Sequence, residues 1–163
     1  MGVFMKIMTA REATAQIESG NTIMLGGFTT RGFPKELVKA LWSHENITDL
    51  TIIVNAPNEH ISPELEQILK TRCKHLKCTF IHSTAAIQLQ NKGKMELMPQ
   101  GNFSEALRMG GAGIPAFYTP VGIGTPVAEN HEIREFDGKQ YMLQKSLTGD
   151  VALFRANVVD KAG

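Results

Sequence analysis

Side chains that could act as nucleophiles or acid–base groups are scattered along this chain, without the spacing of a catalytic site. The five histidines are too dispersed to form a metal-binding motif, and no G-x-S-x-G stretch marks a nucleophilic serine. Ser83 follows His82 directly, but neighbours along a strand point to opposite faces, so we do not expect them to act together. The carboxylates form no obvious catalytic pair. Residue chemistry alone therefore predicts no metal site and no catalytic residue.

The two cysteines, Cys73 and Cys78, are five residues apart and have no second pair that would complete a zinc site. Nothing around Cys73 would lower the pKa of its thiol, so a structural role is favoured over a catalytic one. We expect two reduced, partly buried thiols, as is typical of a cytoplasmic protein.

A glycine-rich stretch, "GGFTTRGFP" at 26–34, follows the apolar run Ile23, Met24 and Leu25. The stretch is neither the G-x-G-x-x-G dinucleotide fingerprint nor a P-loop. Two interpretations stay open at this point. The loop could bind a ligand through bare backbone amides, with Arg31 and Lys35 near an anion. It could equally be a tight crossover that needs glycine only for its dihedral angles.

A second glycine-rich stretch at 111–116 formally matches G-x-G-x-x-A, but we reject it as a nucleotide fingerprint. A predicted helix precedes it where a strand is required, and Pro115 would interrupt the helix that must follow. We expect this loop to form a rigid wall of a cavity, with Phe117 and Tyr118 supplying contact surface. The alternative is a crossover loop on the surface.

The elements that must position these loops alternate between strand and helix. The predicted helices cover 9–18, 34–42, 63–70 and 102–109, with a capping box at Thr9 and Glu12 and a cap at Asn102 followed by Glu105. The predicted strands cover 22–25, 50–54, 78–82 and 94–98, with a final central strand in 150–159 and a closing turn at 160–163. The stretch 110–126 is too rich in glycine and proline for any regular element. Residues 132–143 form two alternating runs around Asp137 and Gly138, which predicts a β-hairpin.

This pattern predicts the α/β class, with a mostly parallel sheet, flanking helices and a β-hairpin near the C-terminus. The length of 163 residues indicates a single domain, 1–163. The net charge of +1, with acidic and basic residues interleaved, argues against a nucleic-acid partner. No apolar run is long enough to span a membrane, so no membrane association is expected.

The stretch "GNTIMLGGFTTRGFP" at 20–34 resembles the first signature of the family I CoA-transferases, although Ser19 stands where that family more often has Asp or Asn. The stretches at 99–129, 132–147 and 150–163 resemble the rest of the α subunit of acetate or 3-oxoacid CoA-transferases. The resemblance runs nearly from end to end. It implies a CoA-transferase-like, Rossmann-related fold.

The resemblance implies transfer of CoA from an acyl-CoA, such as acetyl-CoA or acetoacetyl-CoA, to a free short-chain carboxylate. In the family a glutamate attacks the thioester, forming an anhydride and then a glutamyl-CoA thioester. That glutamate lies in a Ser-Glu-Asn-Gly motif of the β subunit. Here Ala128, Glu129, Asn130 and His131 are only superficially similar, and we interpret Glu129 as a solvated turn residue. The implied partner is a β subunit, and CoA is a substrate, with no permanently bound cofactor.

The resemblance also assigns site residues on the α side. Asn55 would help to stabilise the oxyanion; the alternative is that it merely caps the turn before Pro57. The residues expected to bind CoA are Gly26, Gly27, Phe28, Thr29, Thr30, Arg31 and Gly32. The residues expected in the substrate pocket are Gly111, Ala112, Gly113, Phe117 and Thr119.

Two departures from the family pattern affect these expectations. The stretch "APNEHISPEL" at 56–65 replaces a glycine-rich Gly-Val-Asp-x-Phe-Gly run, so the acyl pocket is expected to differ. The family's α subunits also continue past residue 163, so we expect a fragment, or a short form that needs its partner for cover. Two alternatives remain: an inactive assembly or regulatory homologue, and a sugar-phosphate-binding domain of related fold.

Overall fold

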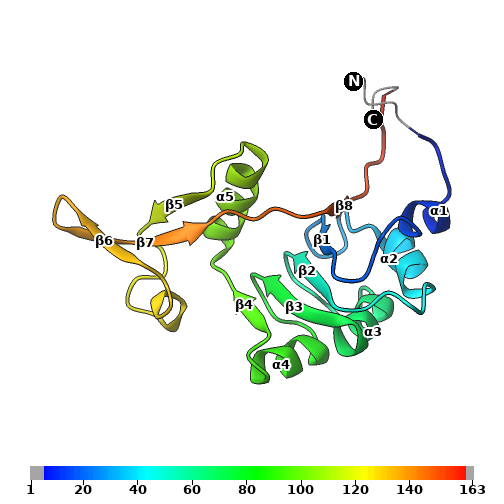
Figure 1. Ribbon diagram of the computed structural model, residues 1–163, viewed down its shortest axis with the longest axis horizontal. Helices are drawn as coiled ribbons and strands as arrows, with labels where there is room; N and C mark the ends of the chain where they lie inside the picture. Colours follow the sequence, from blue (N-terminus) through cyan, green and yellow to red (C-terminus); the bar gives the residue numbers. More distant parts are fainter. Residues whose placement is uncertain (1–5, 161–163) are drawn as a thin grey trace.

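The computed structural model describes residues 6–160, in which two β-sheets are connected through a long helix (Figure 1). The strands are β1 (Thr22–Leu25), β2 (Leu50–Val54), β3 (Cys73–Cys78), β4 (Met95–Leu97), β5 (Ala116–Thr119), β6 (Ile133–Phe136), β7 (Lys139–Lys145) and β8 (Val151–Leu153). The helices are α1 (Ala10–Thr14), α2 (Lys35–Trp42), α3 (Pro63–Thr71), α4 (Thr84–Asn91) and α5 (Gln100–Gly111), with a 3₁₀ turn η1 (Pro126–Ala128). The larger sheet is parallel, in the order β4-β3-β2-β1-β8, and the smaller is antiparallel, in the order β5-β7-β6. The predicted fold class is confirmed.

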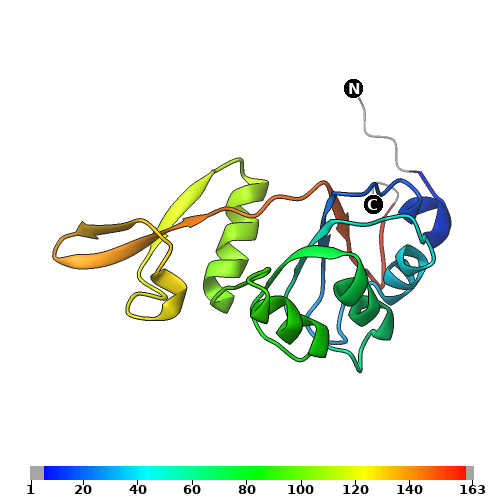
Figure 2. The ribbon, with the colours of Figure 1, turned by 60° about the horizontal axis from the view of Figure 1, so that its bottom comes forward.

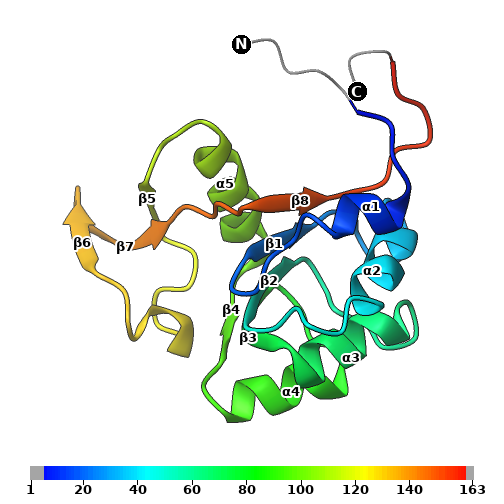
Figure 3. The same cartoon turned by 45° about the vertical axis from the view of Figure 1, so that its right-hand side comes forward.

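Helices cover both faces of the larger sheet (Figure 3). Helices α2, α3 and α4 pack on one face and form the larger core, with α1 against α2, while α5 packs on the other face. Strand β2 contributes to both cores because its side chains alternate between faces. Ile52 and Val54 enter the larger core, and Ile53 enters the smaller one with Phe103 of α5. None of the helices within residues 6–160 combines the length and apolarity that a membrane span requires.

Parallel pairing brings the carboxyl ends of β1, β2 and β8 to one edge of the larger sheet. Leu25 at the end of β1 lies opposite Val54 of β2 and Leu153 of β8. Gly26 and Asn55, the first residues after β1 and β2, therefore emerge side by side. Ligand sites in sheets of this kind lie at this edge.

The smaller sheet projects from the larger one beyond α5 (Figure 2). Its β6–β7 hairpin turns at Asp137 and Gly138, whose φ angles are 50° and 74°. Two consecutive positive φ angles are typical of the tight turn that Asp-Gly favours, so the predicted hairpin is confirmed. Strand β5 pairs with β7 within 110–126, where no regular element was predicted, and that prediction is wrong. The glycines and prolines there lie around β5, which itself contains none.

The strand predicted at 78–82 is wrong in position, because β3 ends at Cys78. Leu76 and Cys78 are buried, whereas His75 and Lys77 lie on the other face, so polar residues interrupt the apolar ones along the strand. The apolar Phe80 belongs to the following connection and is 57% exposed. That connection leads to Ser83, which caps the unpredicted helix α4.

Two predicted helices also differ at their ends. Helix α1 begins with the predicted capping box, in which the Thr9 hydroxyl accepts from the Glu12 N–H at 3.2 Å and the Glu12 carboxylate accepts from the Thr9 N–H at 2.8 Å. It stops at Thr14, after which the backbone continues in shorter turns. Helix α5 begins after Pro99, so Asn102 is an interior residue and not the predicted cap.

The final strand is shorter than predicted and lies at the edge of the larger sheet. β8 covers three residues and, within residues 6–160, pairs only with β1, because the strand order places β1 between β8 and the other strands of the sheet. The prediction of a central strand is therefore wrong. Residues 161–163 of the predicted closing turn lie outside the described residues.

Candidate functional site

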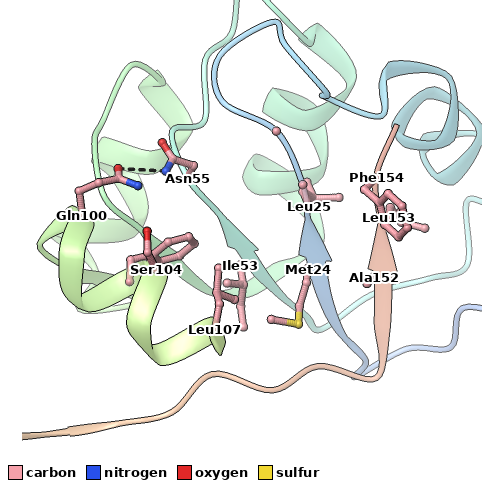
Figure 4. A pocket seen from close by; sticks show the side chains of 13 residues that line it. Met24, Leu25, Ile53, Asn55, Gln100, Ser104, Leu107, Ala152, Leu153 and Phe154 are labelled. Carbon is pink, nitrogen blue, oxygen red and sulfur yellow. Dashed lines mark hydrogen bonds between the residues drawn. The ribbon is translucent and has the colours of Figure 1, made fainter. Parts of the chain in front are cut away.

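A cavity of about 300 Å³ opens at the carboxyl edge of the larger sheet, between β1, β2, β8 and the first two turns of α5 (Figure 4). Met24, Ile53 and Leu107 give it an apolar floor. Asn55 and Gln100 form its polar wall, with Ser104 beside them on α5. Phe154, the residue after β8, lines the opposite side.

Two glycines of the first glycine loop line this cavity, and the fold permits no side chain at either. The Gly26 N–H donates to the Leu153 carbonyl at 2.8 Å, and a Cβ on Gly26 would lie 2.8 Å from Phe154 Cβ. Gly27 has a φ of 101°, and its Cβ would lie 2.6 Å from the Phe33 nitrogen. The close approach of β8 thus explains Gly26, and the left-handed backbone explains Gly27. Because neither residue has a side chain, their backbone atoms are accessible from the cavity.

The tip of the loop is a tight turn outside the cavity. Phe28 and Arg31 exchange two backbone hydrogen bonds of 2.9 Å and 3.1 Å. Between them Thr29 has a φ of 54°, which is strained for a β-branched residue. Phe28, Thr29, Thr30, Arg31 and Gly32 are all exposed, so of the residues predicted to bind CoA only Gly26 and Gly27 line the cavity.

Asn55 is buried at the end of β2, with 8% of its surface exposed. Its Nδ2 amide donates to Gln100 Oε1 at 3.0 Å. The Thr79 hydroxyl lies 2.9 Å from both Gln100 Oε1 and the Asn55 carbonyl oxygen, so its single hydrogen can serve either acceptor. The Thr79 N–H fixes the same carbonyl at 2.8 Å. The Asn55 side chain thus pairs with α5 and does not cap the turn before Pro57.

Gln100 belongs to this polar wall and was missed from the sequence. It follows β4 by three residues and begins α5, and its general signal is a polar residue just beyond the carboxyl end of a strand. With Oε1 facing Asn55 and Thr79, the Gln100 Nε2 amide has no hydrogen-bond partner among residues 6–160. The second N–H of the Asn55 Nδ2 amide likewise has no acceptor among these residues. The wall therefore offers neutral donors to a carbonyl or carboxylate oxygen.

Among residues 6–160, no histidine, cysteine, lysine, arginine or carboxylate side chain lines the cavity. Backbone, amide and hydroxyl groups supply all of its polarity. The site can orient an acyl group and stabilise negative charge on oxygen. Its Ser104 hydroxyl has no general base beside it in the described lining, so the cavity holds no activated group that would attack a thioester.

Comparison with known proteins places this chain in a family. The family model described as Coenzyme A transferase matches residues 7–163. The chain belongs to the coenzyme A transferase family. The resemblance inferred from its glycine loops is therefore confirmed.

Three curated members of the family, each named as one subunit of its enzyme, illustrate the similarity. The subunit from the succinyl-CoA:3-ketoacid coenzyme A transferase of Xanthomonas campestris is 40% identical over 152 residues, covering 90% of this chain and 62% of that protein. The corresponding subunit from the probable succinyl-CoA:3-ketoacid coenzyme A transferase of Bacillus subtilis is 32% identical, covering 96% of this chain and 67% of that protein. The alpha subunit of the acetate CoA-transferase of Escherichia coli is 36% identical, covering 97% and 73%. The chain thus spans about two thirds of the length of these relatives.

Two solved CoA-transferases share the fold. An acyl-CoA transferase from Escherichia coli O157:H7 superposes with a TM-score of 0.78 at 23% identity, over 90% of this chain and 33% of that chain. Glutaconate coenzyme A-transferase from Acidaminococcus fermentans superposes with a TM-score of 0.72 at 20% identity, over 89% and 54%. Both comparisons support the arrangement of the two sheets.

The second glycine loop of this CoA-transferase chain lies away from the cavity. Gly111, Ala112 and Gly113 are exposed at the C-terminal end of α5, whereas the first two turns of that helix line the cavity. Phe117 packs against the smaller core. The Thr119 hydroxyl is buried and donates to Asn102 Oδ1 at 3.1 Å. The structure therefore does not bring the five predicted pocket residues together with Asn55.

The remaining candidate residues of this family member take structural positions. Burial raises the pKa of both Cys73 and Cys78 to about 12, which keeps both thiols protonated. Ser83 caps α4 and donates to the buried Glu66 carboxylate. Glu129 is exposed at the end of η1. Within the described residues no group of three His, Cys, Asp or Glu side chains could hold a metal ion.

Proposed function

We propose that this chain is the α-type subunit of a CoA-transferase that moves CoA between an acyl-CoA and a short-chain carboxylate. One observation supports this most directly: among residues 6–160, the lining of the cavity beneath the glycine loop has hydrogen-bond donors but no activated nucleophile. A binding half of an active site needs only such donors when a second polypeptide brings the attacking group. The names of three curated relatives, each given as one subunit of its enzyme, support the same division.

The proposed role of Asn55 is to donate its free amide N–H to the thioester oxygen as that oxygen becomes negatively charged. One such donor contributes about 3 kcal/mol to transition-state stabilisation. The Gln100 Nε2 amide on the same wall would bind the second oxygen of a carboxylate. Bare backbone at Gly26 and Gly27 lets the acyl-CoA approach these donors, and the exposed loop 28–32 would contact the rest of CoA.

The nucleophile would be a glutamate of the β subunit. Its carboxylate attacks the thioester carbonyl, and the CoA thiolate leaves as an enzyme–acyl anhydride forms. The thiolate then attacks the glutamyl carbonyl, which releases the free carboxylate and gives a glutamyl-CoA thioester. A second carboxylate reverses these steps and leaves with CoA. CoA is therefore a substrate in this scheme and not a resident cofactor.

The proposed substrates are short acyl chains of the acetyl-CoA and acetoacetyl-CoA class. A cavity of about 300 Å³ is at the small end of ligand pockets and suits a short chain better than a long one. We also propose a cytoplasmic location, because free thiols such as Cys73 and Cys78 are typical of a reducing compartment.

The test is reconstitution with the β subunit. We expect the chain and its cognate β subunit to convert acetoacetyl-CoA and acetate to acetyl-CoA and acetoacetate. The decrease in acetoacetyl-CoA absorbance measures this reaction. The Xanthomonas campestris relative, mixed with its own partner, is the positive control. Mass spectrometry after incubation with acyl-CoA should find the CoA adduct on the β subunit. A CoA adduct on Glu129 of this chain would contradict the proposal, as would the absence of turnover in a stable complex.

A further inference from the structure

One face of the smaller sheet carries a connected cluster of aromatic rings and cations. Strand alternation places Phe117, Met142 and Gln144 on the face toward α5, where Phe117 joins the smaller core and the other two are buried. The opposite face carries Tyr118, Arg134, Phe136, Lys139 and Tyr141. These five residues are called the aromatic face below.

The rings of the aromatic face contact one another edge to face. Phe136 lies in the middle, with its ring centroid 5.2 Å from that of Tyr118 and 5.6 Å from that of Tyr141. The interplanar angles are 70° and 73°, the arrangement that ring quadrupoles favour. Phe136 is nevertheless 43% exposed, and every residue of β6 is exposed.

Polar contacts hold these rings in place before any partner arrives. The Tyr118 hydroxyl donates to a Glu132 carboxylate oxygen at 2.6 Å, and an Arg134 guanidinium nitrogen lies 3.4 Å from the same oxygen. Arg134 also lies 5.5 Å from the Tyr118 ring centroid, and the Lys139 ammonium lies 5.6 Å from that of Tyr141. A surface that is ordered in advance loses less side-chain entropy when it binds.

We propose that the aromatic face is the anchor patch for an acidic surface of a second polypeptide, which under the proposed function is the β subunit. Tyr, Phe and Arg are typical of the central residues of protein interfaces. The five residues of the aromatic face include two cations, Arg134 and Lys139, and no carboxylate, because Glu135 lies on the opposite face and Asp137 lies in the turn. Glu132 is already engaged by Tyr118 and Arg134, whereas Lys139 makes no ion pair within residues 6–160. Carboxylates on the partner would form ion pairs with the cations of the aromatic face.

The same charges argue against a second copy of this chain as the occupant. A two-fold interface through the aromatic face would bring two copies of the same positively charged patch together, and like charges at an interface repel. An interface of ordinary size buries about 800 Å² on each side, so the patch is the anchor of a larger contact and not the whole of it. The partner should present an apolar recess for Phe136 with acidic residues at its rim.

The experiment measures association of this chain with its cognate β subunit by sedimentation velocity. Phe136→Ala should weaken association by at least about tenfold, the effect of losing one anchor residue. Ile133→Ala is the matched control, because Ile133 lies on the same strand, on the opposite face, and is also 43% exposed. It should change association less than about twofold. Lys139→Glu should weaken association and reduce its dependence on salt.

The outcomes separate this inference from the proposed function. If the wild-type chain does not associate with the β subunit, the proposed function is contradicted. The assignment of the β subunit as the partner of the aromatic face is then contradicted as well. If the wild-type chain associates and Phe136→Ala binds equally well, only the aromatic face is excluded as an anchor. The same holds if Ile133→Ala weakens binding as much as Phe136→Ala does. Binding of a single-stranded oligonucleotide that Phe136→Ala abolishes would identify a nucleic-acid surface instead. Circular dichroism of each variant checks that its fold is intact.

Discussion

The Asn55 side-chain amide donates to Gln100 Oε1 at 3.0 Å and so joins two residues that are 45 positions apart in the sequence. Asn55 follows the strand β2, and Gln100 begins the helix α5 that covers the other side of the cavity. The pair therefore aligns two neutral amides along one wall. This contact brings two polar residues from distant segments of the chain onto one wall of the cavity.

Replacing Asn55 tests whether its amide supports the reaction. In the complex with the β subunit, Asn55→Ala should lower kcat by more than about tenfold, because a donor to the developing oxyanion is lost. KM should change less than kcat. Asn91→Ala, at the exposed end of α4, is the control and should leave both constants unchanged. An unchanged kcat in Asn55→Ala would remove Asn55 from the oxyanion role.

Thr79 offers a test of the alignment itself. Thr79→Val keeps the shape of the side chain but removes the hydroxyl that lies 2.9 Å from Gln100 Oε1 and from the Asn55 carbonyl. We expect a several-fold fall in kcat and a loss of about 1 kcal/mol in the free energy of unfolding. Thr79→Ser restores the hydroxyl and should recover most of the rate. Equal rates in the Val and Ser variants would show that the hydroxyl does not align the amides.

Gly27 is predicted to be essential for folding of the glycine loop. Gly27→Ala places a Cβ 2.6 Å from the Phe33 nitrogen at a φ of 101°, and should lower the free energy of unfolding by more than about 1 kcal/mol. Gly101→Ala is the matched control, since Gly101 lies in α5 and the added Cβ would have no atom within 4 Å apart from its chain neighbours and the backbone of its own helix. That change should raise stability by about 0.5–1 kcal/mol through higher helix propensity. Urea unfolding of the two variants gives the comparison.

The two cysteines predict a specific response to alkaline pH. Burial raises the pKa of Cys73 and Cys78 from 9.0 to about 12, so above pH 9.0 the unfolded thiols lose protons that the folded thiols keep. The unfolded state then binds fewer protons, and stability falls as pH rises from 9.0 toward about 12. The double variant Cys73→Ala, Cys78→Ala should show a smaller fall. Thermal unfolding across this pH range measures the difference.

The same burial predicts slow labelling of both thiols in the folded chain. At neutral pH, reaction with a thiol-specific disulfide reagent should be slow until denaturant is added, because the thiolate is the reactive form. Fast labelling of Cys73 in the native chain would contradict the raised pKa.

The sequence by itself determined those features that depend on local signals. The strands β1 and β2 have their predicted bounds because short apolar runs between turn residues suffice to specify buried strands. The capping box at Thr9 and the hairpin at Asp137 and Gly138 are likewise local, since their hydrogen bonds and dihedral angles involve neighbouring residues. The glycine signatures were specific enough to indicate the family that the family model confirms.

The tertiary structure alone decided features that depend on contacts between distant segments. β3 is hard to recognise in the sequence because one of its faces is polar, and β8 lies at an edge because of strand order, which its apolar sequence does not encode. Asn102 resembles a helix cap locally, yet it lies inside α5, where it accepts from Thr119 and donates to Val121. The pairing of Asn55 with Gln100, and the separation of residues 111–113 from both, arise only when α5 packs across the sheet. Packing of this kind depends on the whole chain, because each contact is stable only when the others have formed.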